Sequence, residues 1–191
     1  SLEDYNSAEH LILMLVDTVS RGGNLLLDVG PTHDGRIPVI MEERLAEIGR
    51  WLSVNGEAIY GSRRWAKDAQ WSAGTMPEFT KEDHHAGTAL TESTIRPKPG
   101  NASREALFTS KGSTLFALSP GWPVGETFVI RNVTPSDASE VSLLGSQKTL
   151  AWKHVNNTIE IDLRGFGIHD LPCDYVFTFK LTHIKPRSTE K

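Results

Sequence analysis

The chain has 191 residues, a formal charge of −4, 38% hydrophobic and 23% charged residues, and a single cysteine, Cys173. This balance is typical of a globular protein and excludes a disordered chain, while the lack of any long apolar run excludes a membrane helix of roughly 20 residues. The absence of a basic run argues against a nucleic-acid partner. One cysteine excludes an internal disulfide framework and a multi-thiolate metal site.

The first 20 residues predict a helix. Asn6 can cap it, Glu9 follows at the spacing of a capping box, and apolar residues recur at helical intervals from Leu11 to Val19. Since apolar residues also lie between these positions, little of the helix can face water. The chain opens on neither Met nor a signal-like segment, so we expect its first residue to mark a break inside a larger domain.

Residues 24–29, with the sequence NLLLDV, predict a short strand. They show no polar alternation, which indicates burial on both faces as in a parallel sheet. A turn at 32–35 follows, and then a helix entered through Pro38 and ended by Asn55-Gly56. One strand cannot form a sheet, so we expect its partners to lie upstream.

The second half of the chain has a different character. Residues 62–104 are rich in Gly, Pro, Ser, Thr and charge and have no sustained period, which predicts a linker and boundary loops. Beyond them, short apolar segments separated by Gly, Pro and Asn predict an antiparallel β-sandwich. The expected strands are 106–109, 113–118, 127–130, 141–144, 150–152, 159–163 and 175–181.

Several stretches, in order along the chain, resemble the α-L-fucosidases of glycoside hydrolase family 29. They are residues 20–31, 37–45, 49–61, 108–112, 115–117 and 122–123. The fold that this resemblance implies is α/β plus all-β. Residues 1–61 would be the last strand and flanking helices of a (β/α) barrel, 62–104 a linker with boundary loops, and 105–191 a C-terminal antiparallel β-sandwich.

The resemblance also implies a reaction, the retaining hydrolysis of terminal α-L-fucose from glycoconjugates. Double displacement needs two carboxyl groups about 5–5.5 Å apart, one a nucleophile and one an acid/base. By the resemblance, the nucleophile Asp and the acid/base Glu both fall upstream of residue 1. Glu3 is the one candidate acid/base near that register. No cofactor and no metal are implied.

Three residues are candidates for substrate binding. Asp28 would lie at the C-terminal end of a barrel strand, where barrel enzymes carry their active sites, or would instead bond the backbone of the following loop. Leu25 corresponds to a position that is often aromatic in the family and helps to enclose the 6-methyl group of fucose; the alternative is a place in the barrel core. His33 would reach the pocket mouth or simply be exposed on a turn.

The implied partners are a fucosylated glycan and an upstream barrel segment, with no nucleic acid and no membrane, and a homo-oligomer remains open. The family acts mostly in the periplasm, the lysosome or the extracellular medium. The alternative function is a non-catalytic carbohydrate-binding or interaction module built on the sandwich. Exposed tryptophans such as Trp122 and Trp152 would favour that alternative.

Overall fold

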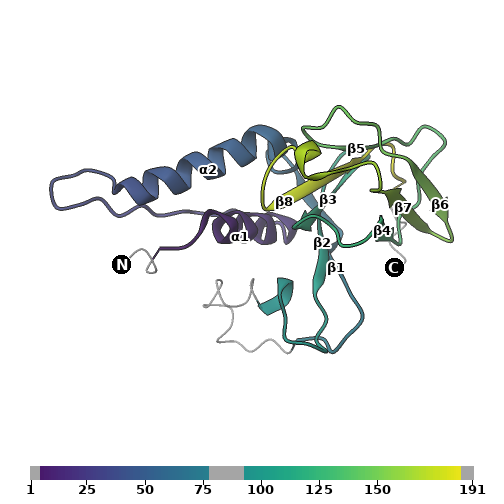
Figure 1. The fold of residues 1–191 in the computed structure, drawn as a ribbon, viewed down its shortest axis with the longest axis horizontal. Helices are drawn as coiled ribbons and strands as arrows, with labels where there is room; N and C mark the ends of the chain where they lie inside the picture. The colour runs from purple at the N-terminus through teal and green to yellow at the C-terminus, as the bar shows by residue number, and fades with distance from the viewer. Residues whose placement is uncertain (1–4, 78–92, 186–191) are drawn as a thin grey trace.

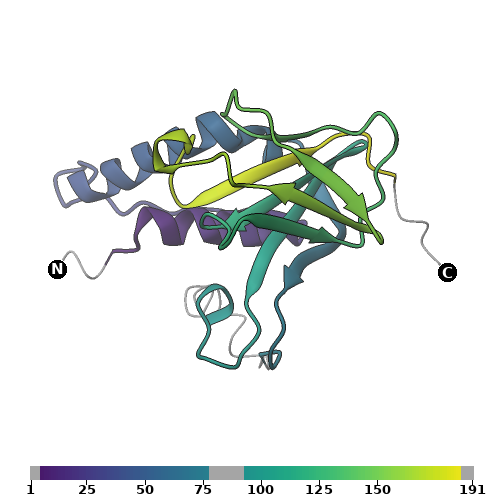
Figure 2. The same ribbon diagram turned by 45° about the vertical axis from the view of Figure 1, so that its right-hand side comes forward.

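The computed structural model describes residues 5–77 and 93–185. Over these residues, two long helices, a five-stranded sheet and a three-stranded sheet form three layers (Figure 1, Figure 2). The long helices are α1 (Ala8–Ser20) and α2 (Val39–Asn55). Two short 3-10 helices are also present: η2 (Gly56–Ala58) directly follows α2, and η4 (Ile168–Asp170) lies between β7 and β8. The strands are β1 (Arg63–Trp71), β2 (Arg104–Lys111), β3 (Thr114–Pro120), β4 (Thr127–Arg131), β5 (Val141–Leu143), β6 (Trp152–Val155), β7 (Thr158–Asp162) and β8 (Val176–Leu181).

All strand pairs in the two sheets are antiparallel. The larger sheet has the order β1-β2-β3-β8-β5 and the smaller one β4-β7-β6. Strand β8 therefore lies between β3 and β5, although it is the last strand of the described chain. The predicted antiparallel β-sheet domain is confirmed by this arrangement.

Two apolar cores hold the three layers together. The first lies between the two sheets and includes Phe108, Phe128 and Phe179; the second lies between the larger sheet and the helices and includes Leu107 and Phe116. Because successive side chains of a strand point to opposite faces, Leu107 and Phe108 of β2 serve different cores. The larger sheet is thus covered on both faces over much of its area.

The first helix begins one residue later than Asn6 would place it. Ser7 is the N-cap, and its hydroxyl accepts a hydrogen bond from the backbone N–H of His10 at 3.1 Å. The prediction of a largely covered helix holds on the sheet side, where Ile12 and Val16 are fully buried. Capping by Asn6 was wrong, since the neighbouring serine occupies that position.

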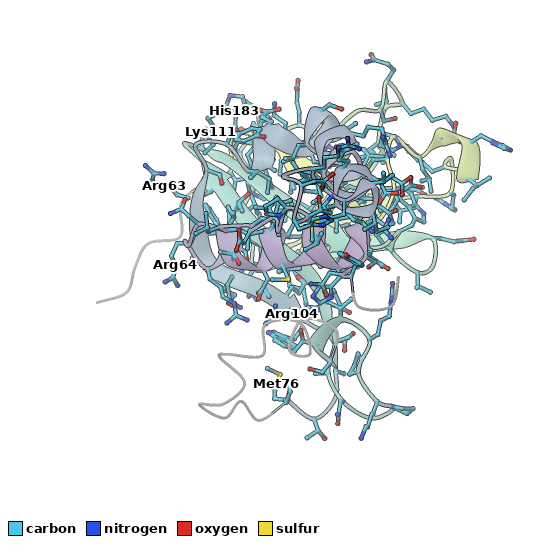
Figure 3. All side chains as sticks on the ribbon, turned by 90° about the vertical axis from the view of Figure 1, so that its left-hand side faces the viewer. Arg63, Arg64, Met76, Arg104, Lys111 and His183 are labelled. Carbon is cyan, nitrogen blue, oxygen red and sulfur yellow. The ribbon has the colours of Figure 1, made fainter. Side chains whose placement is uncertain are left out.

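Helix α1 is tied to β2 by a buried ion pair. Arg104, at the start of β2, is 3% exposed and pairs with Asp17 of α1. Its guanidinium carbon lies 5.2 Å from the centre of the Trp71 ring, within the range of a cation–π contact. Figure 3 shows Arg63 and Arg64 of β1 pointing away from the molecule, whereas Arg104 lies against its body.

Helix α2 is tied to the far end of the chain. The indole Nε1–H of Trp51 donates to the carbonyl oxygen of Val176, the first residue of β8, at 2.8 Å. Just after α2, the carbonyl of Ala58 accepts a hydrogen bond from the Thr109 hydroxyl of β2 at 2.7 Å. Both contacts are buried, so they fix the C-terminal end of α2 on the larger sheet.

The predicted strand at 24–29 does not form. Within the described chain these residues adopt no regular secondary structure, and the side chain of Leu26 is 93% exposed. A strand is stabilised by neighbouring strands, and no other described segment pairs with this one. The prediction of a strand buried on both faces is therefore wrong for this chain by itself.

Strand β1 was also missed, because it lies within residues 62–104 that were predicted to be linker and loops. It pairs with β2, with register shifts between Arg64 and Ala69 and between Gln70 and Trp71. These irregularities remove the simple alternation by which a strand is predicted. No helix within residues 5–77 and 93–185 is long and apolar enough to cross a membrane.

Candidate functional site

The three residues expected to bind substrate all lie in the segment that joins α1 to α2. Residues 22–38 run away from the sheets, turn, and return into α2 (Figure 1). Asp28 and His33 are exposed, and Leu25 is half-buried. Glu3, the candidate acid/base, lies outside the described residues.

Asp28 lines a hollow between the two helices and the joining segment. The hollow measures about 270 Å³ and is lined by Tyr5, Asn6, Leu11, Leu27, Asp28, Val29, Met41, Arg44 and Leu45. Asp28 is the only carboxylate in this set, and most of the other side chains are apolar. Neither Leu25 nor His33 lines the hollow, so the described structure does not bring the three expected residues together there.

His33 is carried by a tightly bonded turn. The Thr32 hydroxyl donates to the carbonyl oxygen of Arg36 at 3.0 Å and also bonds the Asp34 carboxylate. The backbone N–H of Gly35 donates to the carbonyl of Thr32 at 2.9 Å, and Gly35 has the positive φ of +80° that glycine accepts without strain. The turn satisfies its own polar groups, and this leaves the His33 ring exposed.

Sequence reasoning missed Arg44, which is the one charged residue of the lining besides Asp28. Its Nη1 lies 3.3 Å from Glu47 Oε2, while its buried Nε has no hydrogen-bond partner among the described residues. The spacing of Met41, Arg44 and Leu45 along α2 puts them on one helical face, which is the signal that could have identified Arg44.

The hollow by itself cannot carry out double displacement. That chemistry needs a second carboxyl group within about 5–5.5 Å of the first, and Asp28 has no such neighbour in the lining. Within the described residues, no group of three or more His, Cys, Asp or Glu side chains could hold a metal ion. Asp28 and Arg44 can instead accept and donate hydrogen bonds to a polar ligand or to chain that packs beside them.

Two family models match the chain, one after the other. The model described as alpha-L-fucosidase matches residues 1–57, and the model described as alpha-L-fucosidase C-terminal domain matches residues 101–182. The plasma alpha-L-fucosidase of Rattus norvegicus is 34% identical over 185 residues, which are 95% of this chain and 34% of the rat protein. The tissue alpha-L-fucosidase of Homo sapiens is 32% identical over 186 residues, 97% of this chain and 34% of the human one.

Solved structures agree with the sequence matches. The crystal structure of Thermotoga maritima alpha-fucosidase in complex with fucose has a TM-score of 0.64 and 32% identity, covering 95% of this chain and 36% of the Thermotoga chain. The chain thus spans about a third of the length of the relatives it matches. With two family models matched in order and relatives aligned over nearly its whole length, the chain belongs to the α-L-fucosidase family.

Proposed function

We propose that this chain is part of a retaining exo-α-L-fucosidase, which removes terminal α-L-fucose from glycoconjugates by double displacement. Both the nucleophile Asp and the acid/base Glu would be supplied by a region upstream of residue 1. The observation that carries this proposal is the ordered match to the two fucosidase family models. The single carboxylate of the hollow supports the second part of it, because two carboxyl groups are required.

The proposed division of the chain follows the same match. Residues 1–61 would form the end of a catalytic (β/α) barrel, 62–104 the boundary between domains, and 105–191 the sandwich. Strand β1 is a part of the boundary that pairs with the sandwich. The two cores support this division, since one lies wholly between the sheets and the other joins the helices to the larger sheet.

The segment 22–38 supports the idea of an absent barrel. Leu26 is 93% exposed, Val39 69% and Leu45 38%, so apolar side chains face water along the segment and the start of α2. Fully burying one leucine contributes about 1.5–3 kcal/mol. Upstream strands placed beside residues 24–29 would both bury these side chains and supply backbone hydrogen-bond partners.

Within such a barrel, we place three residues near the sugar. Asp28 would orient a sugar hydroxyl or a neighbouring catalytic side chain, and Leu25 would contribute an apolar wall for the 6-methyl group of fucose. His33 would lie at the pocket mouth, on the turn fixed by Thr32. Glu3 stays a candidate acid/base only if the upstream Glu is absent.

The proposed setting follows from the relatives. Proteins named plasma alpha-L-fucosidase are among them, which supports an extracellular, lysosomal or periplasmic location for this chain. Its partners would be a fucosylated glycan and the upstream barrel segment, and copies of the chain could assemble with one another. Neither a nucleic acid nor a membrane partner is proposed.

The proposal is tested with 4-nitrophenyl α-L-fucoside. The 191-residue chain alone should give no turnover, and the protein with the upstream region of its own gene restored should release 4-nitrophenol. Asp28→Asn in the restored protein should keep most of the activity, since the amide preserves shape and hydrogen bonding. Turnover by the isolated chain would disprove the upstream placement of the carboxylates, and an inactive restored protein would disprove the fucosidase assignment.

The alternative of a carbohydrate-binding module is weakened by the packing of the tryptophans on which it depended. Trp122 lies with its ring centre 5.3 Å from that of Phe177 and 6.0 Å from that of Phe179. Trp122 and Trp152 are both only partly exposed and pack against the core between the sheets. Neither is the flat, open platform that the alternative assumed.

A further inference from the structure

A cluster of cationic side chains lies at the start of β1 and at the tip of the β2–β3 hairpin. Its members are Arg63 and Arg64 of β1 and Lys111 of the hairpin, and all of them are exposed. The strand register places them together, because Arg63 pairs with Ser110, the residue next to Lys111. Figure 3 shows the three side chains along one edge of the molecule. We call these three residues the basic edge.

No carboxylate neutralises the basic edge within the described chain. None of its three side chains takes part in an ion pair there. The acidic residues of adjoining elements have other partners: Asp17 of α1 pairs with two other arginines, and Glu57 of η2 pairs with Lys180. Asp68, the one carboxylate of β1, is half-buried. Since the whole chain carries a charge of −4, the basic edge is a local excess of positive charge that attracts anions.

The cations of the basic edge are positioned by the fold but keep donors for a ligand. Arg63 uses only Nη1, which donates to a backbone carbonyl oxygen at 3.0 Å. No hydrogen bond engages the Arg64 guanidinium within the described residues, and its stem lies over Gly22, where an added Cβ would be 3.6 Å from Arg64 Cδ. Lys111 Nζ has one partner, the carbonyl oxygen of Tyr60 at 3.4 Å. Arginine side chains can bond an oxyanion through two parallel N–H groups.

One aromatic ring borders the basic edge. Tyr60 is 63% exposed, and its ring lies against the end of α2, where a Cβ on Gly56 would be 2.9 Å from a ring carbon. A ring held in this way can pack against the C–H face of a sugar. Within the described chain, Tyr60 is the one large apolar side chain that is exposed on residues 56–71 or on the hairpin.

These features favour a sulfated glycan over other polyanions. A surface that binds a membrane needs apolar side chains that enter the lipid, and a single tyrosine is not enough. Single-stranded nucleic acid is bound through successive stacked bases, which needs a series of aromatic side chains. Charges on a free edge strand also prevent unwanted pairing, but this explains only the arginines of β1, because the hairpin that carries Lys111 joins two interior strands.

We propose that the basic edge binds a sulfated oligosaccharide. Arg63, Arg64 and Lys111 bond its sulfate groups, and one of its sugar rings packs against Tyr60. The inference goes beyond the proposed hydrolysis and does not rest on it, since binding is measured without turnover.

Binding is measured by isothermal titration calorimetry with a heparin-derived octasaccharide as the probe. The 191-residue chain and the protein with its upstream region restored should both bind it. A hyaluronan octasaccharide, which has carboxylates but no sulfates, should bind at least about tenfold more weakly. Raising the NaCl concentration from about 50 to about 200 mM should weaken binding of the heparin probe roughly tenfold, because salt screens each contact.

A matched pair of double variants separates the basic edge from the overall charge. Arg63→Glu combined with Arg64→Glu should weaken binding at least about tenfold. Arg50→Glu combined with Lys98→Glu changes the net charge equally at exposed positions elsewhere, and should change the affinity less than about twofold. Near-ultraviolet circular dichroism establishes that both double variants are folded.

The inference is overturned if the heparin octasaccharide does not bind, if the hyaluronan octasaccharide binds equally well, or if both double variants lose affinity equally. Tighter binding of single-stranded oligodeoxythymidine or of phosphatidylserine vesicles would overturn it as well, because the surface would then serve a nucleic acid or a membrane. Binding by the 191-residue chain that disappears in the restored protein would show that upstream chain covers the basic edge, and this would also overturn the inference.

Discussion

Replacing Gln70 by leucine should weaken the junction between the two sheets. Gln70, near the end of β1, is 7% exposed, and its side-chain amide reaches the free edge of β4 in the other sheet. Its Nε2 donates to the carbonyl of Val129 at 2.8 Å and to Glu105 at 3.1 Å, and its Oε1 accepts from the backbone N–H of Arg131 at 2.8 Å. The amide therefore pairs with β4 much as a neighbouring strand would.

The magnitude follows from these three bonds. At about 1 kcal/mol of net stabilisation for each, their loss amounts to about 3 kcal/mol, within an expected range of about 2–4 kcal/mol. Leucine has a similar volume, so little of the effect comes from a cavity. The β4 groups of Val129 and Arg131 would be left without partners at a site that water reaches poorly.

Urea unfolding followed by tryptophan fluorescence measures the effect. The midpoint for Gln70→Leu should fall by roughly 1–2 M with an unchanged slope. Gln147→Leu is the matched control, because Gln147 is exposed and makes no side-chain hydrogen bond within the described structure. A loss of less than about 0.5 kcal/mol for Gln70→Leu would refute the reasoning, since that is the range of ordinary surface substitutions.

Gln70→Glu adds a dependence on pH. The new carboxylate keeps an acceptor for Arg131 but faces the carbonyl of Val129 and the carboxylate of Glu105, so its pKa in the folded state should be raised. A carboxyl group with a raised folded pKa destabilises the fold above that pKa and regains its hydrogen bond to Val129 when protonated. The deficit of Gln70→Glu should therefore shrink as the pH falls from 7 to 4.

Three further predictions concern other contacts. Asp17→Ala should cost about 3–5 kcal/mol of unfolding free energy, and Arg104→Met clearly less, because only the first leaves a buried charge without its partner. Gly145→Ala should lower the free energy of unfolding by about 1–3 kcal/mol, because Gly145 has a φ of +80° and a Cβ there would lie 2.6 Å from a side-chain carbon of α2. Gly165→Ala is the control and should have little effect, because the space around Gly165 is open. Burial raises the pKa of the Cys173 thiol, so the unfolded chain loses this proton at a lower pH than the folded chain does. The melting temperature of the unsubstituted protein should therefore fall as the pH rises above about 8.5, and that of Cys173→Ala should fall less steeply.

The sandwich was largely predictable from sequence, because the alternation of apolar and polar residues within its strands is enough to predict them. In β7, the residues Ile159 and Ile161 are fully buried and alternate with Glu160. In the sequence of β8, Phe177, Phe179 and Leu181 alternate with Thr178 and Lys180, although Thr178 is buried as well. Strand β1 had no such signal. Its buried glutamine is stabilised by backbone groups of another sheet, and a contact of that kind leaves no trace in the local pattern.

The prediction of a strand in the joining segment, residues 22–38, was wrong for the opposite reason. Its run of leucines predicts a buried strand, and a local pattern cannot tell whether the neighbours that would bury it belong to the same chain. For the candidate site, Asp28 could be found as a carboxylate beside a turn. The spacing of Arg44 shows only that it shares a helical face with Met41 and Leu45, and the packing of α2 against the segment places that face in the hollow. The roles of Leu25, Asp28 and His33 stay predictions.

The position of β8 has a consequence for how the protein is made. This strand fills the place between β3 and β5 and receives the indole of Trp51, 125 residues earlier in the chain. At a synthesis rate of about 5–20 residues per second, the helices and first hairpin leave the ribosome several seconds before their central neighbour exists. During that interval one side of β3 is an open strand edge, so the nascent chain can aggregate through it. A stop codon shortly before residue 176 would remove β8, which lies between β3 and β5 in the larger sheet, and would not merely shorten a dispensable tail.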